Sequence, residues 1–476
     1  MIIVATIALY FVILLIFSRI ASKGASDNDT FFRGNRRSPW YMVAYGMVGA
    51  SISGVTLVSV PGMVLHSDMT YLQTCIGFIF GYFAVAFILL PIYYKFNLTT
   101  IYTYLDRRLG TKSYKTGASF FIISKLSGAA VRFYVICLIL DTYVFEPISV
   151  PFAVTVTVMV ALIWLYTRHG GIKTLVWTDT FQTTCLFGAL LLIIYIVASK
   201  LGMSLKEAAE FIYSSDRSRI FVMDDFMSTQ YFWKQFLSGI FIVIVMTGLD
   251  QDMMQKNLSC KSLGEAKKDM CTYGFAFVPA NLLFLSLGLL LAELAFRQGL
   301  ALPSSGDQLL PMFAASGNLG LAVLILFSIG IVAASFSSAD SALTALTTSC
   351  CVDLFCKPKD EKLRKRVHAG LCFVFIIFIL LFRCLNSTSV IDAIYIMCSY
   401  TYGPLLGLFA FAILTKRKAD DSKTPFIAVA SPLVCFVLDL ASTRLFGYKF
   451  GYELLMLNGL LTFFLLRFFS TPKEKP

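Results

Sequence analysis

Charged residues are scarce in this sequence. Asp, Glu, Lys and Arg make up only 14% of its 476 residues, while hydrophobic residues make up 57%. Soluble globular domains carry about 25% charged residues, so the composition excludes an ordinary soluble protein. The mean hydropathy of +0.76 instead indicates a chain that lies largely in lipid.

Histidine is also rare, and the cysteines lack the spacing of a metal site. The three histidines, His66, His169 and His368, lie near the ends of apolar runs, with no nucleophile and base beside them. The 12 cysteines contain no CxxC pair, and most of them lie inside apolar runs. These absences exclude a zinc site, a disulfide framework and the usual catalytic constellations. We therefore expect no enzymatic activity and interpret the cysteines as small apolar residues.

Long apolar runs are abundant instead. A transmembrane helix needs about 20 predominantly apolar residues. Runs of this kind lie near 2–18, 40–64, 72–94, 116–140, 149–167, 174–199, 230–252, 271–296, 318–350, 367–385, 389–415, 425–443 and 450–469. Basic residues follow the first run rather than precede it, so we expect an uncleaved span instead of a signal peptide. The pattern predicts an all-α polytopic membrane protein with about 13 transmembrane helices.

The net charge of +12 is unevenly distributed between the loops. Counted from the apolar runs, alternate loops on one side hold about 29 basic residues, and those on the other side hold about 9. Basic loops stay in the cytoplasm, so this bias predicts an external N-terminus and a cytoplasmic C-terminus. The same distribution argues against a nucleic-acid partner, because the basic residues do not gather in one patch.

Residues 44–62, AYGMVGASISGVTLVSVPG, are unusually rich in glycine for a transmembrane helix. Each glycine costs about 1 kcal/mol relative to alanine inside a helix, so a uniform helix is disfavoured. Glycine permits the close approach of a second helix, or it permits local unwinding that frees carbonyl oxygens to bind an ion. The residues alone leave both interpretations open.

Residues 327–353, FSIGIVAASFSSADSALTALTTSCCVD, are apolar enough to cross a bilayer but rich in hydroxyl groups. Ala334, Ser337, Ser338 and Ser341 recur at helical spacing, so small and hydroxyl-bearing residues share one face. Such a face either packs closely against another helix or binds a cation. A small cation needs about five or six oxygen ligands, so a second stretch of the chain would have to contribute.

The order AASFSSADSALTALTTSCCVD resembles the signature helix of the sodium:solute symporter family. Three more stretches resemble this family in the same order, namely GGIKTLVWTDTFQ at 170–182, TGLDQDMMQKNLSCKS at 247–262 and SYTYGPLLGLFAF at 399–411. The resemblance implies a leucine-transporter-like fold, with a five-plus-five inverted-repeat core, one extra N-terminal helix and two extra C-terminal helices. It also favours the unwound interpretation of the glycine-rich run, and we predict a break near residues 49–54.

The resemblance divides the chain into five parts. These are an extra helix with a cytoplasmic lead-in at 1–37, a first repeat at 38–199, an external loop at 200–229, a second repeat at 230–415 and two C-terminal helices at 416–476. In the family, an Ala-x-x-Ser-Ser element and the broken first core helix supply the sodium ligands. The implied ligands here are the carbonyl oxygens of Gly49, Ile52 and Ala334 and the hydroxyl groups of Ser337 and Ser338. A shift of one residue to Ala50 is left open, and sodium is the only metal implied.

An acid at the inner mouth of a membrane helix, such as Asp179, is costly unless it has a function. The resemblance places this residue near the sodium exit path. The alternative is a carboxylate solvated at the interface beside Lys173. Asp250, Gln251 and Asp252 end the run 230–252, where an intracellular gate role is favoured over contact with the substrate.

Lys125 and Arg132 lie seven residues apart on one face of the run 116–140, too deep for snorkelling to rescue both. They must therefore face the protein interior. Two interpretations stay open: the pair either binds an anionic substrate, or stabilises the bundle by pairing with Asp340 or Asp392.

Sugar-transporting members of the family carry a Gln and an Asn and Tyr where this chain has Thr56, Val243 and Met246. A pocket without those groups would not bind a hexose in the same way, so glucose and galactose are disfavoured. We expect Thr56, Ser59, Met246 and Tyr402 to line the substrate pocket. Carboxylates, amino acids, sugar acids and vitamins remain as candidate substrates.

The resemblance implies sodium-coupled symport of a small organic solute into the cell by alternating access, with sodium as the co-transported ion. The lipid bilayer is the other expected partner, and the expected location is the plasma membrane, as in a bacterial inner membrane. The alternative is a transporter-like membrane sensor, or a sodium channel without coupled uptake. A sensor is disfavoured because only about seven residues follow the last predicted span, as judged from the run length.

A reporter fused after Pro476 should give a cytoplasmic signal. The physical reason is the bias of roughly three to one in basic residues between the two sets of loops. The measurement is a paired set of cytoplasmic and external reporters in intact cells. A fusion that reports only from outside would mean that the predicted helix count is wrong by one.

Overall fold

The computed structural model describes residues 2–21, 28–145, 149–314, 318–385 and 390–472. Within these ranges the chain is helical, as predicted. Its extended pairings there are two isolated bridges, between Ser38 and Cys260 and between Lys418 and Thr471.

The α-helices follow one another along the chain with short 3-10 and π-helical turns between them, which carry the label η. In the first half they are α1 (Ile2–Ala21), α2 (Asn28–Arg33), α3 (Trp40–Ser51), α4 (Gly54–Ser67), α5 (Tyr71–Ala84), η2 (Val85–Leu89), α6 (Leu90–Lys95), α7 (Thr103–Arg108), α8 (Thr111–Leu140), α9 (Phe152–Lys200) and α10 (Leu205–Ser214). In the second half they are α11 (Phe232–Val243), η6 (Ile244–Gly248), α12 (Gln251–Asn257), α13 (Leu263–Arg297), η7 (Gly306–Gln308), α14 (Leu309–Ala314), α15 (Leu321–Ser349), η8 (Cys350–Leu354), α16 (Glu361–Leu385), α17 (Val390–Leu414), α18 (Thr424–Phe446) and α19 (Leu454–Phe468).

Eight of the described helical segments are long and apolar enough to cross a membrane, and the number rises to 10 if each of two bent pairs is one span. The bent pairs are α3 with α4, and α11 and η6 with α12. Three further apolar helices are shorter, at Ala5–Ile20, Phe152–Thr167 and Leu454–Phe468. The chain is therefore a multi-pass membrane protein.

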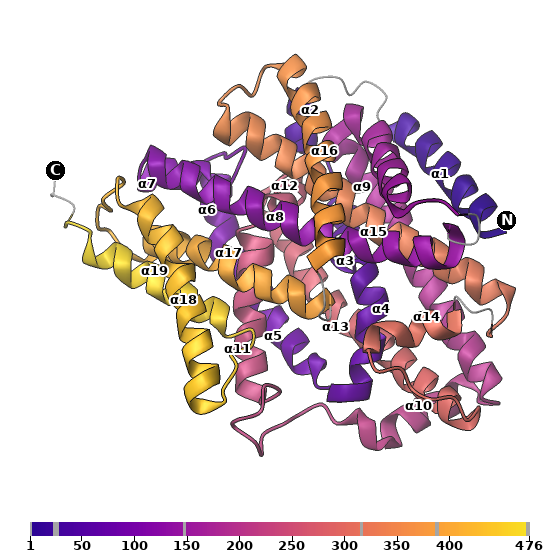
Figure 1. The fold of residues 1–476 in the computed structure, drawn as a ribbon. Helices are drawn as coiled ribbons and strands as arrows, with labels where there is room; N and C mark the ends of the chain where they lie inside the picture. The colour runs from indigo at the N-terminus through magenta and orange to yellow at the C-terminus, as the bar shows by residue number, and fades with distance from the viewer. Residues whose placement is uncertain (1, 22–27, 146–148, 315–317, 386–389, 473–476) are drawn as a thin grey trace.

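Helix α15 lies at the centre of the bundle, where it packs against α3, α4, α8, α9 and α16 (Figure 1). Every residue from 330 to 350 is buried. Its bulky side is anchored by Phe336, whose ring meets those of Phe11 and Phe133 at centroid distances of 4.7 and 5.4 Å. The small and hydroxyl-bearing face predicted from the sequence is left to meet α3, α4 and α9.

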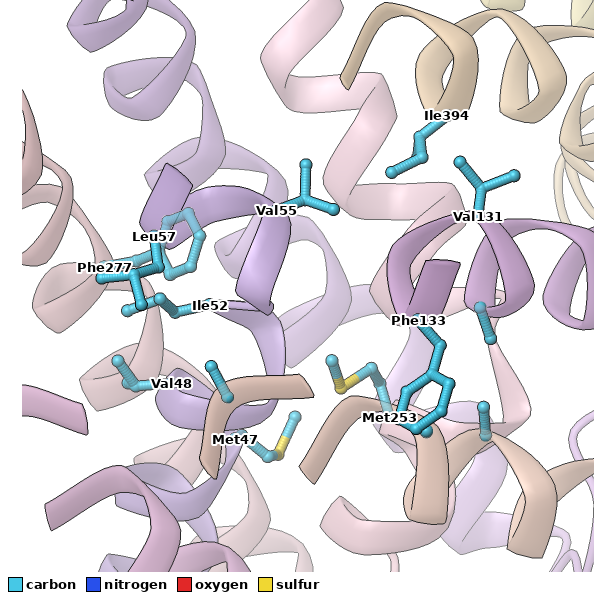
Figure 2. Close-up of a cluster of buried hydrophobic side chains, with 14 of the residues drawn as sticks. Met47, Val48, Ile52, Val55, Leu57, Val131, Phe133, Met253, Phe277 and Ile394 are labelled. Carbon is cyan, nitrogen blue, oxygen red and sulfur yellow. The ribbon is translucent and has the colours of Figure 1, made fainter. Parts of the chain in front are cut away.

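The predicted break in the glycine-rich run is confirmed. Helix α3 ends at Ser51, α4 begins at Gly54, and the two axes differ by 62°. At the break the amide of Ser53 donates to the carbonyl of Ser51 at 3.1 Å instead of continuing the helical ladder. Figure 2 shows how apolar side chains hold the break, with Ile52 and Leu57 on the side of Phe277.

Close packing explains the glycines as well. A Cβ atom at Gly49 would lie 1.8 Å from Oγ1 of Thr183 on α9, and one at Gly54 would lie 2.1 Å from Oγ of Ser335 on α15. Both interpretations left open by the sequence therefore hold, because the run is broken and is also approached closely by two other helices.

A second break lies between α11 and α12, where the axes differ by 70°. This break was not predicted, because residues 239–249 form an apolar segment with only two glycines, Gly239 and Gly248. The π-helical turn η6 leads into the break, and tyrosine hydroxyls satisfy the freed carbonyls: Tyr93 donates to Gly248 at 2.9 Å and Tyr102 to Leu249 at 2.8 Å. Backbone groups at membrane depth need such partners.

The predicted runs 149–167 and 174–199 follow each other without a long loop. They lie in α9, which consists of two helices that meet at a kink at Gly171, where φ is 51° and ψ is −138°. Only glycine adopts this conformation easily, and a Cβ atom there would lie 2.5 Å from the carbonyl oxygen of Phe31. The bend directs the second part of α9 toward α3 and α15.

Replacing Gly288 with alanine should destabilise the protein. A Cβ atom at this position of α13 would lie 1.9 Å from the carbonyl oxygen of Pro61 on α4, so the two helices would have to separate. We expect a loss of about 1–3 kcal/mol in the free energy of unfolding, measured by thermal unfolding in detergent.

The matched control is Gly188→Ala on α9, where no atom lies within 4 Å of the added Cβ. Because alanine has a higher helix propensity than glycine, this variant should leave the free energy of unfolding unchanged or raise it by at most about 1 kcal/mol. Equal melting temperatures for the two variants would contradict the close packing of α4 on α13.

Candidate functional site

The break between α3 and α4 lies against the hydroxyl face of α15. Oγ of Ser338 donates to the carbonyl oxygen of Ala50 at 2.9 Å. This carbonyl belongs to the position that the sequence analysis allowed as an alternative to Gly49. Since a hydroxyl oxygen keeps its lone pairs when it donates, a cation beside this contact could be coordinated by both oxygens.

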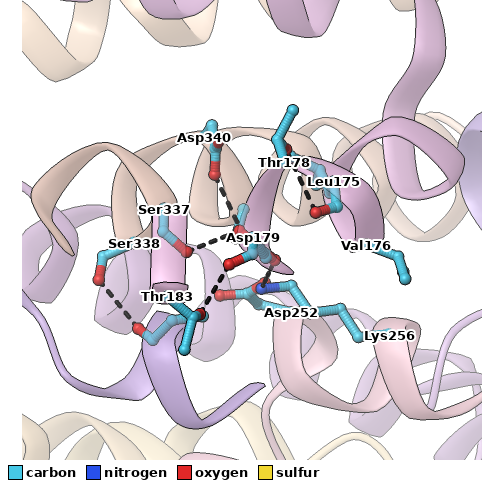
Figure 3. Close-up of polar contacts among 12 residues, drawn as sticks. Leu175, Val176, Thr178, Asp179, Thr183, Asp252, Lys256, Ser337, Ser338 and Asp340 are labelled. Carbon is cyan, nitrogen blue, oxygen red and sulfur yellow. Dashed lines mark hydrogen bonds and ion pairs between the residues drawn. The ribbon is translucent and has the colours of Figure 1, made fainter. Parts of the chain in front are cut away.

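The second serine of the element reaches α9. Oγ of Ser337 donates to Oδ1 of Asp179 at 2.6 Å, and Oδ2 of Asp179 lies 2.8 Å from Nζ of Lys256 on α12 (Figure 3). Asp179 is only 1% exposed. The alternative of a carboxylate solvated beside Lys173 is therefore wrong, because Asp179 lies inside the bundle with a buried ammonium group as its counter-ion.

The other implied ligands lie in the same region. Gly49 and Ile52 flank the end of α3, and Ala334 lies one turn before Ser338 on α15, where it is 1% exposed. The broken ladder leaves the carbonyl of Gly49 without its usual helical donor, since the amide of Ser53 bonds to Ser51. The structure thus brings the two predicted stretches into contact at the position of the helix break.

A cavity of about 110 Å³ lies beside this break, between α4, α8, η6, α13 and α17. Three of the predicted pocket residues, Thr56, Met246 and Tyr402, line it. Val243, which stands where sugar transporters carry a polar side chain, also lines it. Ser59 is not among the residues that line it: it is 3% exposed and lies one turn further along α4, so its place in a substrate pocket stays a prediction.

Lys125 pairs inside the bundle. Its Nζ lies 3.1 Å from Oδ2 of Asp250 and 2.7 Å from Oδ2 of Asp252, and the hydroxyl of Tyr402 donates to Asp250 at 2.6 Å. Two carboxylates and one ammonium therefore meet at the wall of the cavity. Asp250 lines the cavity itself, a position that an inner-gate role alone did not predict.

The partners predicted for Lys125 were different. Asp340 accepts a hydrogen bond of 2.7 Å from the hydroxyl of Tyr166 instead, and the side chain of Asp392 lies outside the described residues. The break before α12 explains the difference, because the bend carries Asp250 and Asp252 toward α8.

Arg132 has a different environment from Lys125. It lies two turns further along α8, lines the cavity and is partly exposed to it. Among the side chains that the structure describes, no carboxylate forms an ion pair with its guanidinium group. The cavity is therefore bordered by a lysine that pairs with two carboxylates and by an arginine without an ion-pair partner among the described side chains.

Two buried groups of this region were missed at the level of the sequence. Lys256 lies within TGLDQDMMQKNLSCKS, where it reads as an ordinary basic residue at a helix end, and Tyr166 lies in an apolar run. No sequence spacing indicates the role of either residue, because their partners Asp179 and Asp340 are on other helices.

An all-helical membrane fold with two broken helices around a partly polar central cavity is that of a secondary transporter. Residues 31–421 match the sodium:solute symporter family, and the chain belongs to this family. It is 25% identical over 462 residues to the sodium/sialic acid symporter NanT of Aliivibrio fischeri (strain ATCC 700601 / ES114), covering 91% of this chain and 87% of that protein.

Two other similarities are informative. The sodium-coupled monocarboxylate transporter 2 of Mus musculus is 25% identical over 429 residues, covering 84% of this chain and 65% of that protein. The substrate-bound, outward-open structure of a Na⁺-coupled sialic acid symporter superimposes with a TM-score of 0.82 at 20% identity over 99% of both chains. The resemblance found in the sequence is confirmed: the protein is a sodium-coupled solute symporter, and sodium is its co-transported ion.

Replacing Ser337 or Ser338 with alanine should raise the sodium concentration needed for half-maximal uptake. Each change removes one hydroxyl oxygen from the predicted sodium site, and the loss of such a ligand costs about 1.5–3 kcal/mol or roughly ten- to a hundredfold in affinity. Uptake at saturating sodium should stay nearly intact. The measurement is the sodium dependence of uptake in proteoliposomes.

The matched control is Ser335→Ala on the same helix. Oγ of Ser335 faces Gly54, and within the described residues it has no hydrogen-bond partner, so its removal breaks no bond. If all three alanine variants keep the sodium dependence of the wild type, the serine face serves only helix packing.

Proposed function

We propose that the protein imports a small organic carboxylate together with sodium, and that Arg132 binds the carboxylate group. The observation that carries this proposal is the arginine in the cavity wall without an ion-pair partner among the described side chains. A cation inside a membrane protein is costly unless a partner compensates it, so a substrate anion is the natural counter-ion. The guanidinium group forms two parallel hydrogen bonds with a carboxylate, which fixes the orientation of the substrate.

The rest of the cavity supports the same substrate class. Lys125 is already paired with Asp250 and Asp252, so it does not compete for the substrate anion. Hydroxyl groups also line the cavity and can bond to a hydroxylated solute; they belong to Ser51, Ser53, Thr56, Tyr71, Tyr82, Ser124, Thr247, Tyr273 and Tyr402. The two relatives named above are described as carriers of sialic acid and of monocarboxylates, and both of these substrates are carboxylates.

The proposed sodium site consists of the carbonyl oxygens of Gly49, Ile52 and Ala334 and the hydroxyl oxygens of Ser337 and Ser338. The contact of Ser338 with Ala50 supports it, because it brings the serine face within bonding distance of the helix break. Asp179 is proposed to lie on the path by which sodium leaves. Its hydrogen bond from Ser337 supports this role, since it places a carboxylate next to a ligand.

The proposed topology has 13 spans, as the number of apolar runs suggests. It comprises the extra helix and lead-in at 1–37, two repeats at 38–199 and 230–415 with an external loop between them, and two helices at 416–476. Breaks in both the first and the sixth core helix, with bends of 62° and 70°, support an inverted repeat. We place the N-terminus outside, the C-terminus in the cytoplasm and the protein in a plasma membrane, on the basis of the charge bias.

Uptake of labelled solutes into proteoliposomes, with and without an inward sodium gradient, tests the proposal. The panel should contain monocarboxylates, sugar acids, neutral sugars and amino acids. Accumulation of carboxylates only with the gradient is expected. Equal uptake with and without the gradient would contradict coupled transport and favour a channel.

Arg132→Gln should raise the KM for the transported carboxylate by about ten- to a hundredfold, because a charge-assisted bidentate contact is lost. Arg132→Lys keeps the charge but not the fork geometry, so its KM should lie between those of wild type and Arg132→Gln. The stabilisation of the purified protein by sodium alone should be unchanged in both. A wild-type KM in Arg132→Gln would mean that the guanidinium group does not bind substrate.

A further inference from the structure

Lys256 is one of the most deeply buried cations of the described chain. Its side chain is 2% exposed, on a seven-residue helix that follows the second break. Its Nζ lies 2.8 Å from Oδ2 of Asp179 and, among the described residues, has no further hydrogen-bond partner. The ammonium group therefore has one carboxylate in direct contact, with Asp252 and Asp340 as further acidic groups nearby, although a buried ammonium usually needs several oxygen partners.

Asp179 is shared between this ammonium and the proposed sodium site. Its Oδ1 accepts the hydroxyl hydrogen of Ser337, and its Oδ2 faces Lys256 (Figure 3). Since Ser337 uses its hydrogen for Asp179, both lone pairs of its oxygen are left for an ion on the other side. Sodium bound by Ser337 would thus lie one hydroxyl group away from the carboxylate that Lys256 neutralises.

We propose that Lys256 is a tethered cation that competes with sodium for the negative charge of Asp179. When the sodium site is empty, the ammonium group holds Asp179. When sodium binds or leaves past Ser337, the carboxylate turns toward the ion and the ammonium group loses its partner. This inference rests on the proposed sodium site and adds a residue that tunes the affinity of that site.

Electrostatics give the direction of the effect. Two cations near one carboxylate repel each other, and a buried site screens this repulsion far less than water does. Lys256 therefore weakens sodium binding and favours sodium release. Low affinity on the inner side is useful to a symporter, because the ion must leave before the carrier returns.

Because Lys256 lies on α12, a change in its pairing with Asp179 would also affect the cavity. Asp252 lies one helical turn earlier on the same helix and pairs with Lys125 at the cavity wall. A shift of α12 caused by the loss of the pair between Lys256 and Asp179 would therefore also move Asp252. The same short helix borders the ion and the solute.

The test is the sodium-dependent thermal stabilisation of the purified full-length protein, with choline chloride keeping the ionic strength constant and no solute present. Lys256→Met should lower the half-saturating sodium concentration by about tenfold, because a nearby like charge is removed. Asp179→Asn should raise it by about tenfold or more, since the anion is lost and the ammonium stays. The double variant Asp179→Asn, Lys256→Met should return to within about threefold of wild type, as both charges are gone.

Two controls separate this role from a structural one. Lys256→Arg retains the cation and should restore the sodium response. Lys206→Met makes the same substitution in an exposed pair on α10, where Lys206 contacts Glu210 and its side chain is 88% exposed. This variant should leave the sodium response unchanged. If Lys256→Met does not fold, Asp179→Asn is compared with the double variant, which should bind sodium at least about tenfold more tightly.

Shifts of opposite sign in the two single variants support the competition. Shifts of the same sign, or a double variant no better than Asp179→Asn, would overturn it and leave the pair a packing contact. Failure of the proposed sodium site would be visible separately, because the wild-type protein would then melt at the same temperature in sodium and in choline.

Discussion

The structure depends on the absence of water inside the bilayer. A helix that breaks there frees amides and carbonyls that only protein groups can satisfy. At the first break Ser338 donates to the carbonyl of Ala50, and at the second Tyr93 and Tyr102 donate to two freed carbonyls. The breaks are therefore possible only where hydroxyl groups from other helices meet them. These contacts are also where an ion or a solute can take the place of a protein partner.

Buried charged side chains are subject to the same constraint, because no water is present to solvate them. Lys125 lies against two carboxylates and Lys256 against one, and each lysine is almost fully buried. Helix α12 carries one member of each cluster, so a short rigid element connects the cavity with the proposed sodium site. Arg132 differs because it borders open volume, which a ligand can fill. Thus the same cost of an uncompensated charge explains the buried ion pairs and underlies the proposed binding of a carboxylate by Arg132.

Much of the site could be predicted before any contact was known. The glycine density indicated the first break, and the periodicity of Ala334, Ser337 and Ser338 indicated the face of α15 that meets it. Three of the four residues predicted for the substrate pocket, Thr56, Met246 and Tyr402, line one cavity, and Ser59 is not among its lining residues. The second break was not predicted, because Gly248 alone does not indicate a break and the tyrosines that bond to its carbonyls lie on a distant segment.

The sequence by itself determined the membrane class, the apolar spans and the small-residue face, because hydropathy and helical periodicity are local properties of the chain. Only the tertiary structure decided which groups become partners. Several carboxylates along the chain were equally plausible for Lys125, and Lys256 carried no signal of its bond to Asp179. Ser338 and Ala50 meet across 288 positions of sequence. A buried charge or a freed carbonyl accepts any suitable group within reach, and the packing of the helices determines which group that is.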